Sequence, residues 1–382
     1  MPKKIPSIGL LVSLMMFPQI VETIYSPALT DISRAFDVTP ESSSLTLSIY
    51  FMAFALGVVI WGRLSDLIGR RYAMLGGLIC YALGSGLAVM ADHFTLFLVA
   101  RALAAFGASV GSIVTQRVLR DSYTGDNLAK VFAVMGMAIS ISPVVGFLSG
   151  GWLTHWHGYQ GVLWSLTGLA LVLLLWSGGA LPETRPEAHE SPDFLSTVGQ
   201  LVTDGRLWCH GLLVALFNVM LFSYYSLAPF MFEQLGYSSK AFGYSGLVLG
   251  VASLVGSLMN KKLLSRGKSS NRIVWTGILS SAIGALLLLL LQQSIGFLVG
   301  VIFVVVGFGL VIPNVLSVAL KRYRAVAGTA GAWFGLTYYL LIGLGLWLSG
   351  EGQNLGLTMG ACSLTAVIVQ LLLQRGSADK AI

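Results

Sequence analysis

The sequence predicts an all-α membrane protein with twelve transmembrane helices in two pseudo-symmetric bundles of six. Only 10% of its 382 residues are charged and 55% are hydrophobic, whereas soluble chains carry about 25% charged residues. The mean hydropathy is +0.81. Because so much apolar surface cannot be buried in one protein core, we expect lipid to surround much of the chain. In lipid the backbone N–H and C=O groups must bond to each other, and a helix satisfies them within one segment.

Long apolar runs define the predicted helices, since a helix crosses a bilayer with about 20 such residues. The first run follows two lysines but has no small-residue cleavage site, so we interpret it as an uncleaved helix rather than a signal peptide. The least distinct boundary is near 292–294, and without a turn there the count falls to eleven. The predicted helices are residues 8–29, 42–61, 72–91, 95–115, 130–151, 161–181, 207–232, 240–260, 272–292, 294–316, 326–349 and 354–374.

Basic residues set the predicted orientation of these helices. If the N-terminus is cytoplasmic, all of the 23 Lys and Arg residues except Arg34, Arg101 and Lys240 fall on the cytoplasmic side. This asymmetry follows the positive-inside rule and places both termini in the cytoplasm. It also explains the net charge of +7 without a nucleic-acid partner. We expect a multi-pass protein of the bacterial inner membrane.

The longest polar connection predicts the domain organisation. Residues 182–206 contain five of the 16 Asp and Glu residues, more than any other connection, and separate a bundle at 1–181 from a bundle at 207–382. Two such halves suggest parallel repeats about an axis along the membrane normal. The three cysteines are far apart, no histidines have metal-binding spacing, and no P-loop is present. GASVG at 107–111 fits a hydrolase pattern by chance, because it lies inside an apolar helix. We therefore expect no cofactor, no metal and no enzymatic activity.

A charged motif, GRLSDLIGRR at 62–71, forms the cytoplasmic turn between the second and third predicted helices. Gly62 and Gly69 suit a tight reversal. Arg70 and Arg71 hold the turn in the cytoplasm, but Asp66 contributes little to orientation and needs a partner, either Arg70 or the positive end of a neighbouring helix. The motif resembles the loop signature of the major facilitator superfamily, G-x-L-x-D-R-x-G-R-R.

This resemblance implies a conformational latch formed by the five residues just named. In that family the acid faces the start of the eleventh helix in the outward-facing state. Here that start, residues 325–335, is rich in small residues that allow close approach. Leu67 stands where relatives often carry Arg, so one link of their charge relay is absent. The equivalent turn at 260–272 has no acid, which makes the expected latch one-sided.

The fifth predicted helix has one face that is poor in side chains. Gly136, Pro143, Gly146 and Gly150 lie within an arc of about 80° at 100° per residue. This face either makes a close helix–helix contact or acts as a hinge or seal between halves. It resembles the motif G-P-x-x-G-G of drug:proton antiporters. The segments at 23–36, 181–186 and 222–238 resemble exporters of the bicyclomycin and chloramphenicol-resistance type in the same superfamily.

Glu22 and Arg101 are the only charges well inside predicted helices. Because each costs about 3 kcal/mol or more in hydrocarbon, they should face the bundle interior. Glu22 shares a helix face with Gln19 and Tyr25. It could carry the coupling proton with Arg101 as modulator, recognise a cationic substrate, or form a static pair with Arg101. Many relatives carry Asp at the position of Thr23, one residue later.

The resemblance also implies that helices 1, 4, 7 and 10 line a central cavity, with 5, 8 and 11 contributing. An aromatic and Met-rich wall with few charges suits a mostly apolar ligand. We therefore predict a monomeric, proton-coupled antiporter that exports amphipathic drugs or other small organic compounds. The alternatives are an exporter of one endogenous metabolite, such as a siderophore, and a non-transporting receptor. The candidate lining residues are Gln19, Tyr25, Met135, Met137, Asn218, Tyr224, Tyr225, Tyr244, Asn314 and Tyr338.

Overall fold

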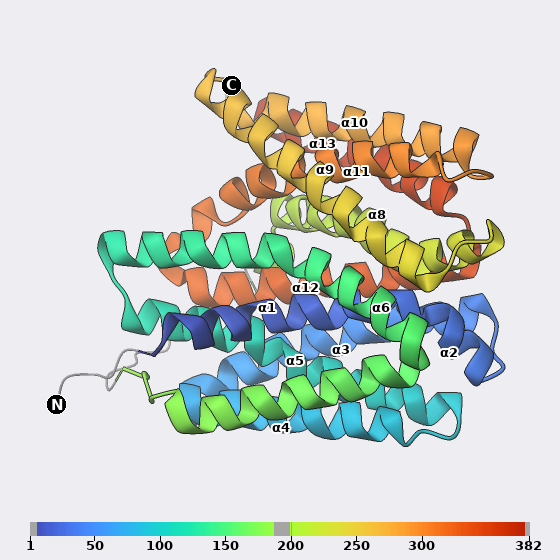
Figure 1. The fold of residues 1–382 in the computed structure, drawn as a ribbon. Coiled ribbons are helices and arrows are strands. Elements are labelled where there is room, and N and C mark those ends of the chain that lie inside the picture. Colours follow the sequence, from blue (N-terminus) through green and yellow to red (C-terminus); the bar gives the residue numbers. More distant parts are fainter. Residues whose placement is uncertain (1–5, 187–198, 200, 379–382) are drawn as a thin grey trace. The chain divides into compact units, whose positions relative to one another are not determined.

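The computed structural model describes residues 6–186, 199 and 201–378, and all regular secondary structure among them is helical (Figure 1). The chain forms two compact units. The first contains Met1–Glu190 and Ser238–Gly246, and the second contains Ser191–Tyr237 and Leu247–Ile382. The assignment of 182–206 as the linker stays a prediction, and much of it (187–198 and 200) lies outside the described residues.

The first unit is built from long helices with identifiable start signals. Ser7 accepts a hydrogen bond from Leu10 N at the start of the first helix, and Thr39 accepts one from Ser42 N where Pro40 opens the third. The elements are α1 (Ile8–Ile24), η1 (Ser26–Ala28), α2 (Leu29–Ala35), α3 (Pro40–Leu67), α4 (Arg70–Val89), α5 (Phe94–Ser122) and α6 (Gly125–Ala180).

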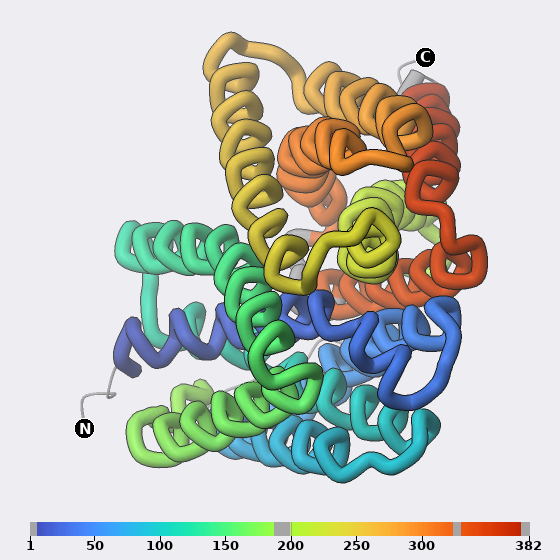
Figure 2. The backbone as a smooth tube through the Cα atoms, turned by 45° about the vertical axis from the view of Figure 1, so that its right-hand side comes forward, coloured from blue at the N-terminus to red at the C-terminus, as the bar shows by residue number. Residues whose placement is uncertain are grey.

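The 56 residues of α6 contain two of the predicted membrane helices. Gly158 has φ 63° and ψ −169°, a conformation that glycine adopts without strain, and the helix changes direction there. The segments before and after Gly158 run in different directions (Figures 1 and 2). In the described residues 11 helices are long and apolar enough to span a membrane, with α6 counted once. Counting its two segments separately agrees with the predicted twelve, so the predicted fold class is confirmed.

The second unit contains most of the remaining helices. The side chain of Asp204 accepts hydrogen bonds from Arg206 N and Leu207 N, and thereby caps its first helix. The least distinct predicted boundary is a real turn, since one helix ends at Leu291 and the next begins at Phe297. The elements are α8 (Gly205–Gln234), α9 (Ser239–Ser265, whose first residues group with the first unit), α10 (Ser270–Leu291), α11 (Phe297–Ala319), η2 (Lys321–Val326), α12 (Ala327–Gly352) and α13 (Leu355–Ala378).

Small residues bring helices close together in both units. A Cβ at Gly84 of α4 would meet backbone atoms of Ala104 in α5 within 2.5–2.9 Å. A Cβ at Gly300 of α11 would meet the Gly284 carbonyl of α10 at 2.5 Å. Helix association in lipid relies on such contacts, because the surrounding tails are as apolar as the side chains.

Candidate functional site

A buried charged cluster lies between α1, α3 and α5 of the first unit. Glu22 is 5% exposed and Arg101 is 2% exposed. The Arg101 Cζ atom lies 3.9 Å from the ring centroid of Tyr25 and 5.1 Å from that of Tyr50. The structure therefore brings together the predicted Glu22, Tyr25 and Arg101. Tyr50 was missed in the sequence, because a tyrosine in an apolar helix carries no signal of its position relative to a distant arginine.

The polar atoms of this cluster are incompletely paired. Among the described residues, neither Glu22 Oε2 nor Arg101 Nε has a hydrogen-bond partner, and the Tyr50 hydroxyl also lacks one. Arg101 is close enough to exert a Coulombic attraction on Glu22. Removal from water favours the neutral form of a carboxyl, while a nearby cation favours its charged form. The two influences therefore act on the charged form of Glu22 in opposite directions.

Glu22 and the following Thr23 face different neighbours. A Cβ at Gly146 of α6 would collide with the Thr23 side chain, so Thr23 lies against α6. The Thr23 hydroxyl donates a hydrogen bond to the Gln19 carbonyl at 2.7 Å, so this hydroxyl finds its partner within α1. Consecutive residues differ in direction by about 100° around a helix. Glu22 therefore faces Arg101, while Thr23 faces the glycines of α6.

The side-chain-poor face of α6 makes a close contact with α1. A Cβ added at Gly146 would clash with the Thr23 side chain, and a Cβ added at Gly150 would clash with the Ile24 carbonyl. Gly136 has nothing within 4 Å, and Pro143 lies inside the continuous helix. Gly146 and Gly150 therefore form a close helix–helix contact within the first unit. Whether this face also acts as a hinge stays a prediction.

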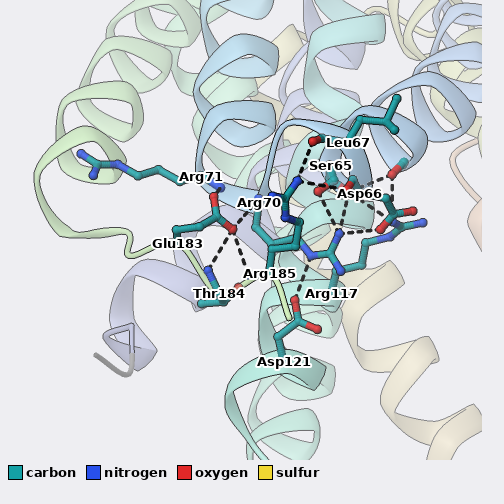
Figure 3. A network of polar contacts seen from close by, with 11 residues as sticks. Ser65, Asp66, Leu67, Arg70, Arg71, Arg117, Asp121, Glu183, Thr184 and Arg185 are labelled. Carbon is teal, nitrogen blue, oxygen red and sulfur yellow. Dashed lines mark hydrogen bonds and ion pairs between the residues drawn. The ribbon is translucent and has the colours of Figure 1, made fainter. Parts of the chain in front are cut away.

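A second cluster surrounds the turn between α3 and α4 (Figure 3). Asp66 Oδ1 accepts from Arg70 Nη1 at 2.6 Å and is also ion-paired with Arg117 of α5. Arg70, only 3% exposed, also donates from Nε to Asp121 Oδ2 at 2.8 Å. Of the two partners expected for Asp66, the structure places Arg70 beside it. Charge-assisted bonds of this kind are among the strongest in proteins.

Two members of this turn cluster, Arg117 and Asp121, were missed as site residues. They are four residues apart at the end of α5 and so lie on one helix face. In the sequence Arg117 counts only as a basic residue that sets the orientation. Its pairing with Asp66 supplies a second positive partner in a motif where Leu67 replaces the usual Arg. Gly69, with φ 102°, makes the reversal between α3 and α4.

The residues after α6 also contact this turn. Arg71 Nη2 donates to the Gly178 carbonyl at 2.5 Å. The carboxylate of Glu183 accepts from the backbone N–H groups of Arg70 and Arg71, and Figure 3 shows it beside the start of α4. Partial burial raises the pKa of Glu183, but backbone hydrogen bonds from Arg185, Arg70, Arg71 and Thr184 outweigh it, so the pKa lies below its ordinary value.

The candidate lining residues of the first unit occupy different environments. Gln19 is half-buried and Met135 is 1% exposed, whereas Met137 is 61% exposed. Met135 and Met137 lie about 200° apart around α6, so they do not share a face. Tyr244, which groups with the first unit, is 44% exposed. The substrate roles of these residues stay predictions.

The candidate lining residues of the second unit are mostly buried. Asn314 Nδ2 donates to Asn260 Oδ1 at 2.7 Å and to the Leu310 carbonyl at 2.8 Å. Tyr224 and Tyr225 are both buried, with ring centroids 6.3 Å apart. Asn218 Nδ2 donates to the Val214 carbonyl, and the half-buried Tyr338 packs between Phe334 and Tyr339. In the described part of the chain no group of His, Cys, Asp or Glu is arranged to hold a metal.

Comparison with known proteins gives a family match over most of the chain. The profile described as "Major Facilitator Superfamily" matches residues 11–346. An "Uncharacterized transporter" of Rickettsia bellii is 34% identical over 358 residues, which are 89% of this chain and 88% of the relative. "Multidrug resistance protein D" of Escherichia coli is 26% identical, covering 95% and 94%. A "Bicyclomycin resistance protein homolog" of Haemophilus influenzae is 24% identical, covering 94% of each.

The fold has a similar solved structure. A D-xylose-proton symporter superimposes with a TM-score of 0.74 over 96% of each chain, at 16% sequence identity. At this identity the likeness concerns the fold alone. The sequence relatives and the fold agree with the resemblance to the Major Facilitator Superfamily inferred from the motif at 62–71.

Proposed function

The chain belongs to the Major Facilitator Superfamily, and from this membership we propose that it is a proton-coupled antiporter. It exports amphipathic drugs or other small organic compounds across the bacterial inner membrane by alternating access, with both termini in the cytoplasm. Family and relatives make it a transporter of small molecules rather than an enzyme. Because the family and these relatives are transporters, they favour transport over the alternative of a non-transporting receptor.

The observation that carries the proposal is the buried carboxyl of Glu22. One of its oxygens has no hydrogen-bond partner among the described residues, and a cation on α5 attracts it. A charge held in this way within a membrane helix is costly and normally serves function. Protonation removes the charge at the cost of losing the attraction of Arg101. Glu22 thus binds a proton from one compartment and releases it to the other.

Arg101 modulates this exchange, and Asp66 acts as the latch. The stack of the guanidinium on the Tyr25 ring keeps Arg101 close to Glu22 in both protonation states. The Asp66–Arg70–Arg117 group holds the α3–α4 turn in one arrangement. Release and re-formation of this group accompany the change between inward-facing and outward-facing states.

The substrate class follows from residue chemistry and from the relatives. The candidate lining residues are mostly Tyr, Met, Asn and Gln, which suit a ligand with a large apolar surface and few polar groups. Two relatives are named for resistance to several drugs or to bicyclomycin. Export of one endogenous compound such as a siderophore is the alternative, and uptake profiling with a panel of unrelated drugs separates the two.

Transport in inverted membrane vesicles tests the proposal, with ethidium and chloramphenicol as probes. An imposed pH gradient, acidic inside, should drive accumulation by the natural chain. Glu22→Gln should reach the membrane at the same level, but its rate of gradient-driven accumulation should fall at least tenfold, because glutamine cannot exchange a proton.

Glu351→Gln is the matched control for this experiment, because Glu351 is an exposed acid near the end of α12. Its rate should equal that of the natural chain. Proton coupling through Glu22 is wrong if Glu22→Gln accumulates either probe at the natural rate under the gradient.

A further inference from the structure

The chain just after α6 contacts both ends of the α3–α4 turn. Glu183 Oε1 accepts from Arg70 N at 2.9 Å, and Oε2 accepts from Arg71 N at 3.2 Å. These amides belong to the first turn of α4, where no intrahelical carbonyl can accept from them. The same carboxylate accepts from the N–H groups of Thr184 and Arg185 at 3.0 and 2.9 Å. An acid at a helix N-terminus also interacts favourably with the helix dipole.

Arg185 makes the complementary contact at the end of α3. Its Nη1 donates to the Leu67 carbonyl at 2.5 Å and to the Asp66 carbonyl at 3.3 Å. The last carbonyls of a helix lack intrahelical donors, and a cation is favourable there. An acid and a base two residues apart thus cap two different helix ends that meet at one turn.

Two further contacts connect the turn and this segment. The Arg71 guanidinium of α4 donates to the Gly178 carbonyl in the last turn of α6. This bond joins α4 to α6 in addition to the bonds that Glu183 and Arg185 make. Gly69 has φ 102°, and a Cβ there would overlap the Glu183 carboxylate. The glycine is therefore required for the approach of Glu183 as well as for the reversal of the chain.

We propose that residues 181–186 form a clasp, in which Glu183 and Arg185 position the α3–α4 turn so that Asp66 stays between Arg70 and Arg117. The clasp rests on the proposed latch role of Asp66, and it assigns positioning residues to that latch. Because residue 186 leads directly into the connection between the two halves, the clasp also fastens the start of that connection to the turn. A displacement of Glu183 and Arg185 uncaps both helix ends and frees Asp66 to change partners.

Hydrogen exchange of the purified full chain tests the clasp without any transport assay. In the natural chain the amides of Arg70 and Arg71 should be protected, because Glu183 is the acceptor found for both. In Glu183→Ala these two amides should exchange at least tenfold faster, while amides in the middle of α4 keep their rates. Unchanged rates at both positions would overturn the clasp.

Two other variants keep this result interpretable. Asp126→Ala removes an exposed acid from the first turn of α6 and should leave residues 70 and 71 unaffected. If Glu183→Ala does not fold, Glu183→Gln is used. Its amide retains one oxygen but loses the negative charge, so the same two amides should exchange at an intermediate rate, and a rate equal to the natural one would again overturn the clasp.

The positioning role predicts a specific kinetic pattern for ethidium transport. Arg185→Gln should lower the maximal rate at least threefold and leave the KM unchanged, and Arg185→Lys, which keeps the charge, should restore part of the rate. The exposed Arg63 on α3 provides the control Arg63→Gln, with natural kinetics. If Arg185→Gln transports at the natural maximal rate, the positioning role is overturned. If the natural chain does not transport ethidium at all, that result counts against the proposed function, while the hydrogen-exchange test of the clasp still stands.

Discussion

At the scale of the residue, the position of one arginine defines the chemistry of the membrane-buried cluster. Arg101 is almost fully buried and its guanidinium lies over two tyrosine rings on different helices. A planar guanidinium combines charge with stacking, which a lysine ammonium on a flexible stem does not. The sequence indicated that Arg101 faces the protein interior, because a charge in an apolar helix must do so. It placed Tyr25 on the helix face of Glu22 but held no indication of the Tyr50 ring.

We therefore expect Arg101→Lys to separate these two properties. The positive charge beside Glu22 remains, but the stacking contacts are lost, which should destabilise the folded chain by about 1–2 kcal/mol. Thermal unfolding in detergent measures this change. Arg120→Lys, at an exposed position near the end of the same helix, should show no change, and equal stability of both variants would contradict the stacking role.

At the scale of the element, helix ends account for the α3–α4 turn. Glu183 caps the start of α4, and Arg185 caps the end of α3. The resemblance singled out the glycines and arginines of this turn. It could not identify Glu183 as their partner, because 113 residues separate Glu183 from Arg70 and only the packing of α6 brings them together.

The pH dependence of the clasp follows from the pKa of Glu183. Partial burial raises this pKa, but the four backbone N–H donors lower it more, to a value below 4.5. Such an acid stabilises the folded state above its unfolded-state pKa, and this contribution is lost as the pH falls through the folded-state pKa. Exchange protection at residues 70 and 71, corrected for intrinsic rates, should thus be equal at pH 7 and 5 and decrease only when the pH falls below the ordinary pKa of a glutamate. A loss of protection between pH 7 and 5 would contradict this assignment.

At the scale of the whole molecule, alternating access requires a group whose pairing can change between states. Asp66 is suited to this role because two arginines from different helices share it. The first half carries this acid, and the corresponding turn at 260–272 has none. The proposed latch therefore belongs to one half of the chain.

We expect Asp66→Asn to slow transport without loss of binding. Asparagine keeps the shape of the side chain but cannot hold two arginines by charge, so one of the alternating states loses stability. Ethidium binding to the purified variant, followed by fluorescence, should match that of the natural chain, while the maximal transport rate should fall at least fivefold. A natural rate of transport would show that Asp66 has no latch role.

The sequence by itself determined the fold class and the family, and it predicted eleven or twelve helices long enough to cross a membrane. These depend on local properties, namely apolar length, charge placement and one short motif, which each segment carries independently of the others. Tertiary structure alone decided which side chains meet: Arg101 with Tyr50, Asp66 with Arg117, and Glu183 with the start of α4. These contacts join residues far apart in the chain, and the rotation and depth of each helix, set by its packing against neighbours, determine them.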